Sequence, residues 1–245
     1  MKEKRRIYLL DDLRGIAVIG MVIYHLVYSL AYIFHKAPAV DMMYCLDFLT
    51  SFAGIFIFIC GICTRFTKSN YKRGAKLFLL SLIISIVTLF VPDNAIYFGI
   101  LHLLSLSILF FQLTRRILDK IPPAIGIVIF TLLFIVTAPV SVGYLNLIVA
   151  TIKLPMTFYS TPFLFPFGFP EGSFVSADYF PLLPNLFLFL AGSYAGVYFK
   201  RGNYPAVLNK PLLKPVEFIG RHSLVIYVLH QPVILTVLFI LFKIF

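Results

Sequence analysis

Residues 11–30 read DDLRGIAVIGMVIYHLVYSL and open an apolar run that extends from Leu13 to Phe34. About 20 apolar residues suffice for a helix to cross a bilayer, and this run is long enough. His25 follows Arg14 by eleven positions, which at about 1.5 Å per residue places it about 16 Å farther along, near the bilayer midplane. An ionisable side chain at that depth is unfavourable in lipid. We therefore expect His25 to face a protein or water-filled interior, where it either joins helices or takes part in chemistry.

The composition of the whole chain is that of a membrane protein. Of its 245 residues, 60% are hydrophobic and 13% are charged, and the mean hydropathy is +0.96. A net charge of +11 would favour nucleic acid in a soluble protein, but here the basic residues adjoin apolar segments, as in cytoplasmic membrane flanks. We predict no nucleic-acid partner. The expected fold is an all-α polytopic membrane helix bundle, with residues 1–245 forming a single domain.

Seven apolar runs are long enough to span the membrane, or nearly so. Between them the connections alternate in charge, with basic residues on one side and mainly acidic residues on the other. Because lysine and arginine gather on the cytoplasmic side, we predict a cytoplasmic N-terminus and an extracytoplasmic C-terminus. The runs are Leu13–Phe34, Phe48–Cys63, Ala75–Val91, Tyr97–Leu113, Pro122–Ala138, Phe180–Phe199 and Ser223–Phe242.

The predicted orientation rests on the following charged residues. The predicted cytoplasmic set is Lys2, Lys4, Arg5 and Arg6, then Arg65, Lys68, Lys72, Arg73 and Lys76, then Arg115, Arg116 and Lys120, and finally Lys200, Arg201, Lys210, Lys214 and Arg221. The predicted outer connections carry only Lys36 and Lys153 among the bases, with Asp41, Asp47, Asp93, Glu171 and Asp178.

The segment Pro139–Tyr179 departs from this pattern. It is too long for a simple connection, and its apolar piece Tyr144–Thr151 is too short to span. A stretch rich in proline, phenylalanine and glycine follows. Irregular backbone of this kind occurs at the membrane interface or along a protein cavity. Two interpretations stay open, namely an aromatic surface loop and a lid over an outward-facing site.

Several polar groups should lie between the midplane and the outer surface. His25 lies in the first run and His102 enters its run from outside, whereas His230 enters from inside and approaches the midplane from below. His35 lies at the outer end of the first run, and Asp178 begins the sixth from the same side. Histidine with a carboxylate partner suits general base catalysis near neutral pH. We expect His25 and His102 to line one cavity.

The inner end offers an anion site. Asp12 is expected to cap the first helix or to pair with Arg14. Arg221 is expected to open the last helix, where a helix N-terminus beside arginine suits an anion, although basic residues there also set topology. No histidine spacing indicates a metal, and no glycine-rich phosphate loop or GxSxG motif occurs. A proton-coupled small-solute transporter and a structural membrane subunit remain alternatives to an enzyme.

The opening DDLRGIAVIGMVIYHLVYSL resembles the first helix of the transmembrane acyltransferase superfamily. It is most similar to bacterial relatives of the heparan-alpha-glucosaminide N-acetyltransferase catalytic domain. FIFICG, FGILHLLSLSILF, DYFPLLP and GRHSLVIYVLHQPV match in the same order and cover most of the chain. The resemblance implies transfer of an acyl group, expected to be acetyl, from cytoplasmic acyl-CoA to a hydroxyl or amine of an extracytoplasmic acceptor.

The resemblance also implies roles for individual residues. In the polysaccharide O-acetylating branch, an arginine, ten residues and a histidine form the functional pair, a spacing that Arg14 and His25 reproduce. The N-acetyltransferase branch has asparagine at the position of His25 and its key histidine near His35. The catalytic candidates are thus Arg14, His25 and His35. The substrate-binding and cofactor-binding candidates are Asp12, His102, Asp178, Arg221 and His230.

The partners implied are an acyl-CoA as donor substrate, a glycan or amino-sugar acceptor and the lipid bilayer, with a homodimer left open. No permanently bound cofactor and no metal are expected. The location implied is the plasma membrane of a bacterial cell. Histidine would act either as the base in direct transfer or as a covalent acyl carrier.

The orientation generates a labelling prediction. In a chain whose three cysteines have been replaced, a cysteine introduced within Arg65–Arg73 should be shielded from an impermeant thiol reagent in sealed cells. One within Gly168–Ser176 should react, because that segment is expected outside. The reverse pattern would overturn the assignment of donor and acceptor sides.

Overall fold

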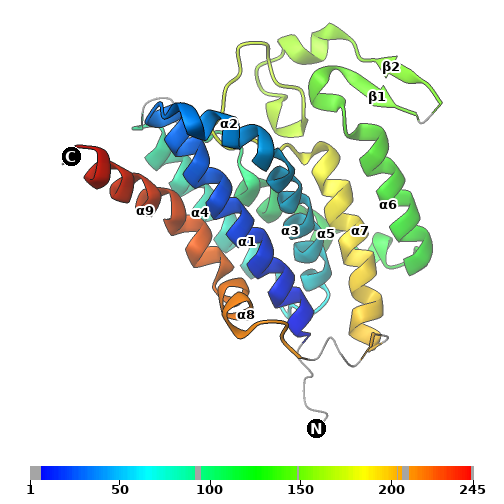
Figure 1. Ribbon diagram of the computed structural model, residues 1–245. Coiled ribbons are helices and arrows are strands. Elements are labelled where there is room, and N and C mark those ends of the chain that lie inside the picture. The colour runs from blue at the N-terminus through cyan, green and yellow to red at the C-terminus, as the bar shows by residue number, and fades with distance from the viewer. Residues whose placement is uncertain (1–6, 92–94, 148, 203, 206–209, 244–245) are drawn as a thin grey trace. The chain divides into compact units, whose positions relative to one another are not determined.

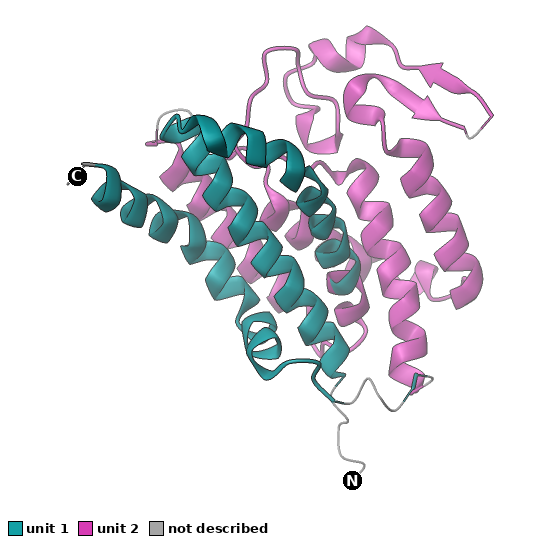
Figure 2. Cartoon of the chain, in the orientation of Figure 1, with its two compact units in different colours: residues 1–59, 204–245 teal, residues 60–203 magenta. Residues whose placement is uncertain are grey.

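The computed structural model describes residues 7–91, 95–147, 149–202, 204–205 and 210–243. The bases Lys2, Lys4, Arg5 and Arg6, and also Asp93, which entered the orientation prediction, lie outside these ranges. The chain divides into two compact units, described separately below (Figure 2). Unit 1 comprises Met1–Ile59 with Tyr204–Phe245, and unit 2 comprises Cys60–Asn203. Whether the chain acts as a single domain stays a prediction.

Helices make up 73% of the structure, which confirms the all-α class. Six helical stretches are long and apolar enough to cross a membrane, so the protein is a multi-pass membrane protein. The remaining predicted run lies in α4, whose first two turns carry Lys72, Arg73 and Lys76 and lower its apolar character. The count of seven stays a prediction. The six stretches are Tyr8–Ile33, Ala37–Thr64, Ile100–Leu118, Pro123–Val142, Leu182–Arg201 and Ser223–Phe242.

Unit 1 is built from the two ends of the chain (Figure 1). The first helix continues from an α-helix into a π-helix at Ser29, and a short helix, α8, precedes the last one. The elements are α1 (Tyr8–Tyr28), η1 (Ser29–Ile33), α2 (Ala37–Leu46), η2 (Asp47–Thr50), α3 (Ser51–Thr64, of which the part to Ile59 belongs here), α8 (Lys214–Arg221) and α9 (Ser223–Lys243).

The backbones of helices α1 and α8 are in direct contact where the two helices cross. A Cβ atom added to Gly15 would overlap the carbonyl oxygen of Val216, and one added to Gly220 would overlap the carbonyl oxygen of Asp11. Only glycine fits at both positions, which is the usual device for close helix packing in membranes. The connection 202–222 was not expected to contain a helix. Arg221 therefore ends α8 rather than opening the last helix, so that expectation was wrong.

Unit 2 contains the remaining long helices and the irregular outer segment (Figure 1). Gly126 of α6 lies directly beneath the ring of Tyr194, whose hydroxyl donates to the carbonyl oxygen of Leu118 at 2.7 Å. The elements are the last turn of α3, α4 (Asn70–Thr88), α5 (Ile100–Leu118), α6 (Pro123–Thr137), η3 (Val140–Val142), β1 (Tyr144–Asn146), β2 (Thr151–Lys153), η4 (Met156–Ser160), η5 (Phe165–Phe167) and α7 (Leu182–Arg201).

Aromatic packing orders the outer segment. After the antiparallel β1–β2 hairpin, Phe174 stacks on Phe165 at 4.9 Å and meets Tyr179 at 5.0 Å between ring centroids. The Tyr179 hydroxyl donates to the carbonyl oxygen of Phe165 at 2.7 Å. Burial raises the pKa of Tyr179 to about 12, so this hydroxyl keeps its proton at physiological pH. The segment is folded; the surface-loop and lid interpretations both stay open.

Replacing Gly220 with alanine should destabilise the protein by about 1–3 kcal/mol, because the added carbon overpacks the crossing of α1 and α8. Thermal unfolding in detergent should show a lower Tm. Gly172→Ala is the matched control, since no atom lies within 4 Å of a Cβ built there. Equal unfolding temperatures for the two variants would show that the crossing tolerates a wider separation.

Candidate active site

Two histidines from opposite ends of the chain meet inside unit 1. The ring of His25 on α1 lies 4.9 Å from the ring of His230 on α9, measured between centroids. Tyr24 meets the edge of His25 at 5.6 Å, and Tyr227 lies 5.7 Å from His230. The sequence nominated His25 as catalytic and His230 as substrate-binding, and the structure places them side by side.

The tautomer of His230 follows from its backbone contact. Its Nδ1 lies 2.6 Å from the carbonyl oxygen of Tyr227. A carbonyl oxygen only accepts, so Nδ1 carries the proton, and in the neutral ring Nε2 presents its lone pair. Nε2 is buried and has no hydrogen-bond partner. The pair therefore holds a basic nitrogen whose hydrogen-bonding capacity is unused.

A second polar contact joins the same helices next to the histidine pair. Gln231 donates from Nε2 to the hydroxyl of Ser29 at 3.2 Å, and that hydroxyl donates to the backbone carbonyl of His25 at 2.8 Å. Ser29 begins the π-helix, and Pro232 interrupts the hydrogen-bond ladder of α9. Both helices are therefore irregular at the level where the histidines meet, as is common at functional sites.

A tyrosine ladder runs along the C-terminal half of the first helix, beside His25. Tyr24, Tyr28 and Tyr32 are spaced four apart, with ring centroids 6.4 Å and 4.9 Å apart along the series. They line a pocket of about 470 Å³ together with Met43, Tyr44 and Asp47. Since Tyr24 also touches His25, the pocket adjoins the histidine pair and offers phenol hydroxyls, aromatic faces and one carboxylate to a ligand.

His35 lies away from the histidine pair, in the turn after η1. It is exposed, and its φ of 51° is a left-handed conformation that few residues other than glycine adopt. It follows His25 by ten residues, at the outer end of the same helix. The two histidines predicted as the base thus occupy different settings, since His25 lies inside the helices of unit 1 and His35 is exposed at the end of the first helix, on the predicted outer side.

The acidic residues at the inner end of α1 have separate partners. Asp11 accepts from Arg14 at 3.0 Å. Asp12 is fully buried, and its Oδ2 accepts from the backbone N–H of Leu212 at 3.0 Å, while its Oδ1 has no hydrogen-bond partner. The expectation that Asp12 caps the first helix was wrong, because α1 begins four residues earlier, at Tyr8. Asp12 instead holds the segment that leads into α8.

Two candidate residues, Arg14 and Arg221, each adjoin a glycine of the α1–α8 crossing. Arg14 precedes Gly15, and Arg221 follows Gly220. Arg221 is half exposed and lies 3.6 Å from Glu217, one turn earlier on α8. The backbones of both arginines therefore lie next to the same helix crossing.

His102 and Asp178 lie together in unit 2, at the start of α5. Asp178 accepts from the backbone N–H of Ile100 at 3.0 Å, and Nδ1 of His102 accepts from that of Gly99 at 3.3 Å. Ser85 donates to the carbonyl of Ile96 and lies 3.4 Å from Nε2 of His102, where it can accept. These contacts cap the N-terminus of α5. Because His102 belongs to unit 2 and His25 to unit 1, their common cavity stays a prediction.

Some residues of this arrangement were missed in the sequence. The sequence alone predicts no role for four of them, because small polar and aromatic residues are common in membrane helices. They are Tyr28, Ser29, Tyr32 and Gln231. The i, i+4, i+8 spacing of the tyrosines was the available signal for the ladder. Among the described residues, no group of three or more histidine, cysteine or acidic side chains is placed to hold a metal ion.

The fold and this site define a polytopic membrane protein with a polar, histidine-containing interior. The family model for the catalytic region of heparan-alpha-glucosaminide N-acetyltransferase matches residues 6–232. The chain therefore belongs to this family of membrane acetyltransferases. No curated protein and no solved structure matches it.

Asp12→Ala should lower the unfolding temperature, because a buried hydrogen bond to a charged group typically contributes about 1.5–3 kcal/mol. Asp12→Asn should lose less, since its amide oxygen still accepts from Leu212. Asp41→Ala, at an exposed position of α2, is the control for loss of one carboxylate. If Asp12→Ala unfolds at the wild-type temperature, Asp12 does not act through this bond, and its substrate-binding assignment is favoured.

Proposed function

We propose that this chain is an integral-membrane acyltransferase. It moves an acetyl group from cytoplasmic acetyl-CoA to a hydroxyl or amine of an extracytoplasmic glycan or amino sugar. The pairing of His25 with His230 carries the proposal, because it sets two imidazole rings side by side inside a membrane helix pair. Family membership supports acyl transfer, and the alternating basic connections support the direction.

The first helix and the elements packed against it supply groups suited to each substrate along the length of that helix. At its predicted cytoplasmic end, Arg14 and Arg221 adjoin the α1–α8 crossing and would attract the anionic part of CoA. At its outer half, the tyrosine ladder and Asp47 offer stacking surfaces and a hydrogen-bond acceptor for a sugar ring. The histidine pair lies between these two ends.

The reaction needs little beyond positioning and one proton transfer, because a thioester is already activated. In our proposal, His25 takes the proton of the acceptor hydroxyl or amine while that oxygen or nitrogen attacks the thioester carbon. The carbon–sulfur bond breaks, and the departing thiolate recovers the proton from the histidinium. His230 lies beside the His25 ring with a fixed tautomer, and the Gln231–Ser29 contact holds the two helices together at that level.

In this mechanism the acetyl group passes directly from acetyl-CoA to the acceptor, with His25 as the base. A covalent acyl-histidine on His25 would use the same geometry and would be trapped as an acetylated protein when acetyl-CoA is supplied without acceptor. His35 is the alternative base, and its exposed position on the predicted outer side would suit an acceptor that stays outside the bundle. Hydroxyl and amine acceptors would both deliver their proton to the same base.

The activity is tested with purified protein in lipid nanodiscs and labelled acetyl-CoA. Oligosaccharides that end in a free amino sugar or carry hydroxyls alone are the acceptors, and labelled product is identified by mass spectrometry. Acceptor-dependent transfer supports the proposal. Uptake of a labelled solute into vesicles without any acetyl transfer would favour the proton-coupled transporter instead.

His25→Ala should lower the transfer rate by about 100- to 10,000-fold, as expected for loss of a general base. The variant should still insert and purify, because one polar side chain contributes only about 1 kcal/mol to helix association in membranes. Comparing kcat in nanodiscs with that of wild type measures the effect.

His35→Ala is the matched control for this experiment. Near-normal turnover of His25→Ala together with loss of turnover in His35→Ala would move the base to His35. If both variants keep turnover, the acyltransferase mechanism drawn above is wrong at its central step.

A further inference from the structure

Unit 2 contains a basic pocket of about 260 Å³ that the proposed reaction does not use. It lies where α5 and α7 end and α6 begins, all on the predicted cytoplasmic side. Four basic side chains line it against a single carboxylate; the bases are Arg65, Arg115, Lys200 and Arg201, and the acid is Asp119.

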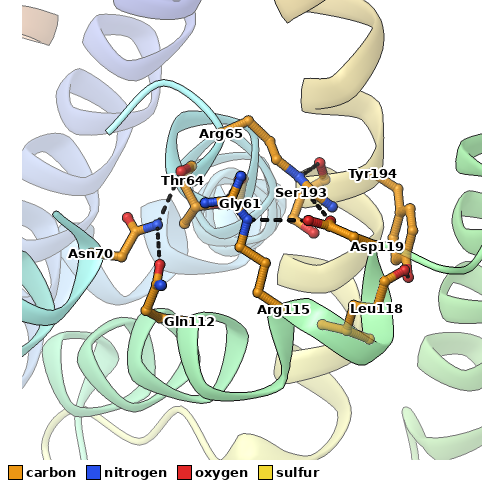
Figure 3. A network of polar contacts seen from close by, with 10 residues as sticks. All are labelled: Gly61, Thr64, Arg65, Asn70, Gln112, Arg115, Leu118, Asp119, Ser193 and Tyr194. Atoms are coloured by element: carbon orange, nitrogen blue, oxygen red, sulfur yellow. Dashed lines mark hydrogen bonds and ion pairs between the residues drawn. The ribbon is translucent and has the colours of Figure 1, made fainter. Parts of the chain in front are cut away.

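Arg65 is the buried side chain among the residues that line this pocket. Figure 3 shows Arg65 with its polar partners. Its side chain is only 5% exposed. Nε donates to the carbonyl oxygen of Ser193 at 2.9 Å, and Nη1 pairs with Asp119. The guanidinium also lies over the rings of Phe111 and Tyr194, 4.8 Å and 5.6 Å from their centroids. These contacts hold the planar group in one orientation.

One nitrogen of this fixed group remains without a partner. Nη2 of Arg65 is buried and makes no hydrogen bond. A buried charged donor without an acceptor is costly, and buried charges are normally paired. A bound anion would supply the missing acceptor.

The charges around the pocket also favour an anion. Asp119 accepts from Arg65 and, at 3.2 Å, from Arg115. Burial alone would raise the pKa of Asp119, but the hydrogen bonds and charges of Arg65 and Arg115 outweigh this effect and hold the pKa below its ordinary value. Asp119 is therefore ionised at neutral pH and offsets one of the four positive charges. Lys200 and Arg201, both exposed, add positive charge at the end of α7.

Topology alone does not account for this combination. Basic residues at a helix C-terminus favour the helix dipole and the cytoplasmic side, which explains Lys200 and Arg201 by themselves. The helix dipole and the positive-inside rule do not explain a pocket lined by a buried arginine, one of whose nitrogens has no hydrogen-bond partner. The volume is smaller than the roughly 300–1,000 Å³ of sites for drug-sized ligands, which suits one phosphate-bearing group, whether a lipid headgroup or the phosphate portion of a larger molecule.

We propose that this pocket binds a phosphate group, with Arg65 as the buried donor and Lys200 and Arg201 as the outer cations. Arginine matches the planar, bidentate geometry of phosphate oxygens, and lysine adds a point charge. Two sources present this chemistry on the cytoplasmic side, namely the headgroup of an anionic lipid and the phosphates of a soluble molecule such as CoA. The proposal concerns binding and does not depend on acyl transfer.

The test compares two double variants of equal charge. Lys200→Gln/Arg201→Gln removes the outer cations of the pocket, while Arg116→Gln/Lys120→Gln removes two exposed bases near the end of α5 that do not line it. Arg65 is kept in both, so the buried contacts that hold the helices remain. Affinity is measured by thermal shift and native mass spectrometry with inorganic phosphate, CoA, and nanodiscs of phosphatidylglycerol or phosphatidylcholine.

The wild type and the Arg116/Lys120 variant should bind a phosphate-bearing probe alike, and the Lys200/Arg201 variant should bind it at least about tenfold more weakly, since two charge-assisted contacts are lost. A response to phosphatidylglycerol alone identifies a lipid headgroup, and a response to CoA or inorganic phosphate identifies a soluble ligand. Equal binding by the two double variants, or no binding by the wild type, would overturn the proposal. Acetyl transfer is a separate readout, so its absence would not count against the pocket.

Discussion

A polar side chain within a membrane helix has no water to bond, so it must find its partner in the protein. Each unit of this chain is organised around that constraint. In unit 1, the histidine pair and the Ser29–Gln231 contact join the first helix to the last. In unit 2, Asn70 donates to Gln112 at 3.1 Å and thereby joins α4 to α5. Such contacts select one helix pairing among many that apolar surfaces alone would allow.

The crossing of α1 and α8 shows how the same constraint shapes the inner end of unit 1. Two glycines bring the helix backbones together, and the buried Asp12 accepts the N–H of Leu212 just before α8 begins. The residues of the segment Asp11–Gly15 (DDLRG) thus have different roles. Asp12 and Gly15 hold the crossing. Arg14 is paired with Asp11, and in our proposal it also attracts an anionic substrate.

The first helix contributes most of the residues of the proposed reaction, because different kinds of side chain occur at successive positions along it. Arg14 comes first along this helix, and His25 follows it within the stretch Tyr24–Tyr32 that forms the tyrosine ladder, so their order along the chain is also their order along the helix axis. A helix supplies this order rigidly, which a loop would not. The second histidine comes from the last helix, so an intact site needs both ends of the chain.

The amino-acid sequence by itself determined the class of the protein, the apolar stretches, the family and the spacing of Arg14 and His25, because hydropathy and motifs are properties of neighbouring residues. Only the tertiary structure decided that His25 meets His230, that Asp12 holds Leu212 rather than capping its own helix, and that His102 and Asp178 cap α5. It also placed Asp47 beside the tyrosine ladder. These contacts join residues up to about 200 positions apart, through helix packing that depends on small residues and complementary surfaces on both partners, and no local pattern encodes which two helices will meet.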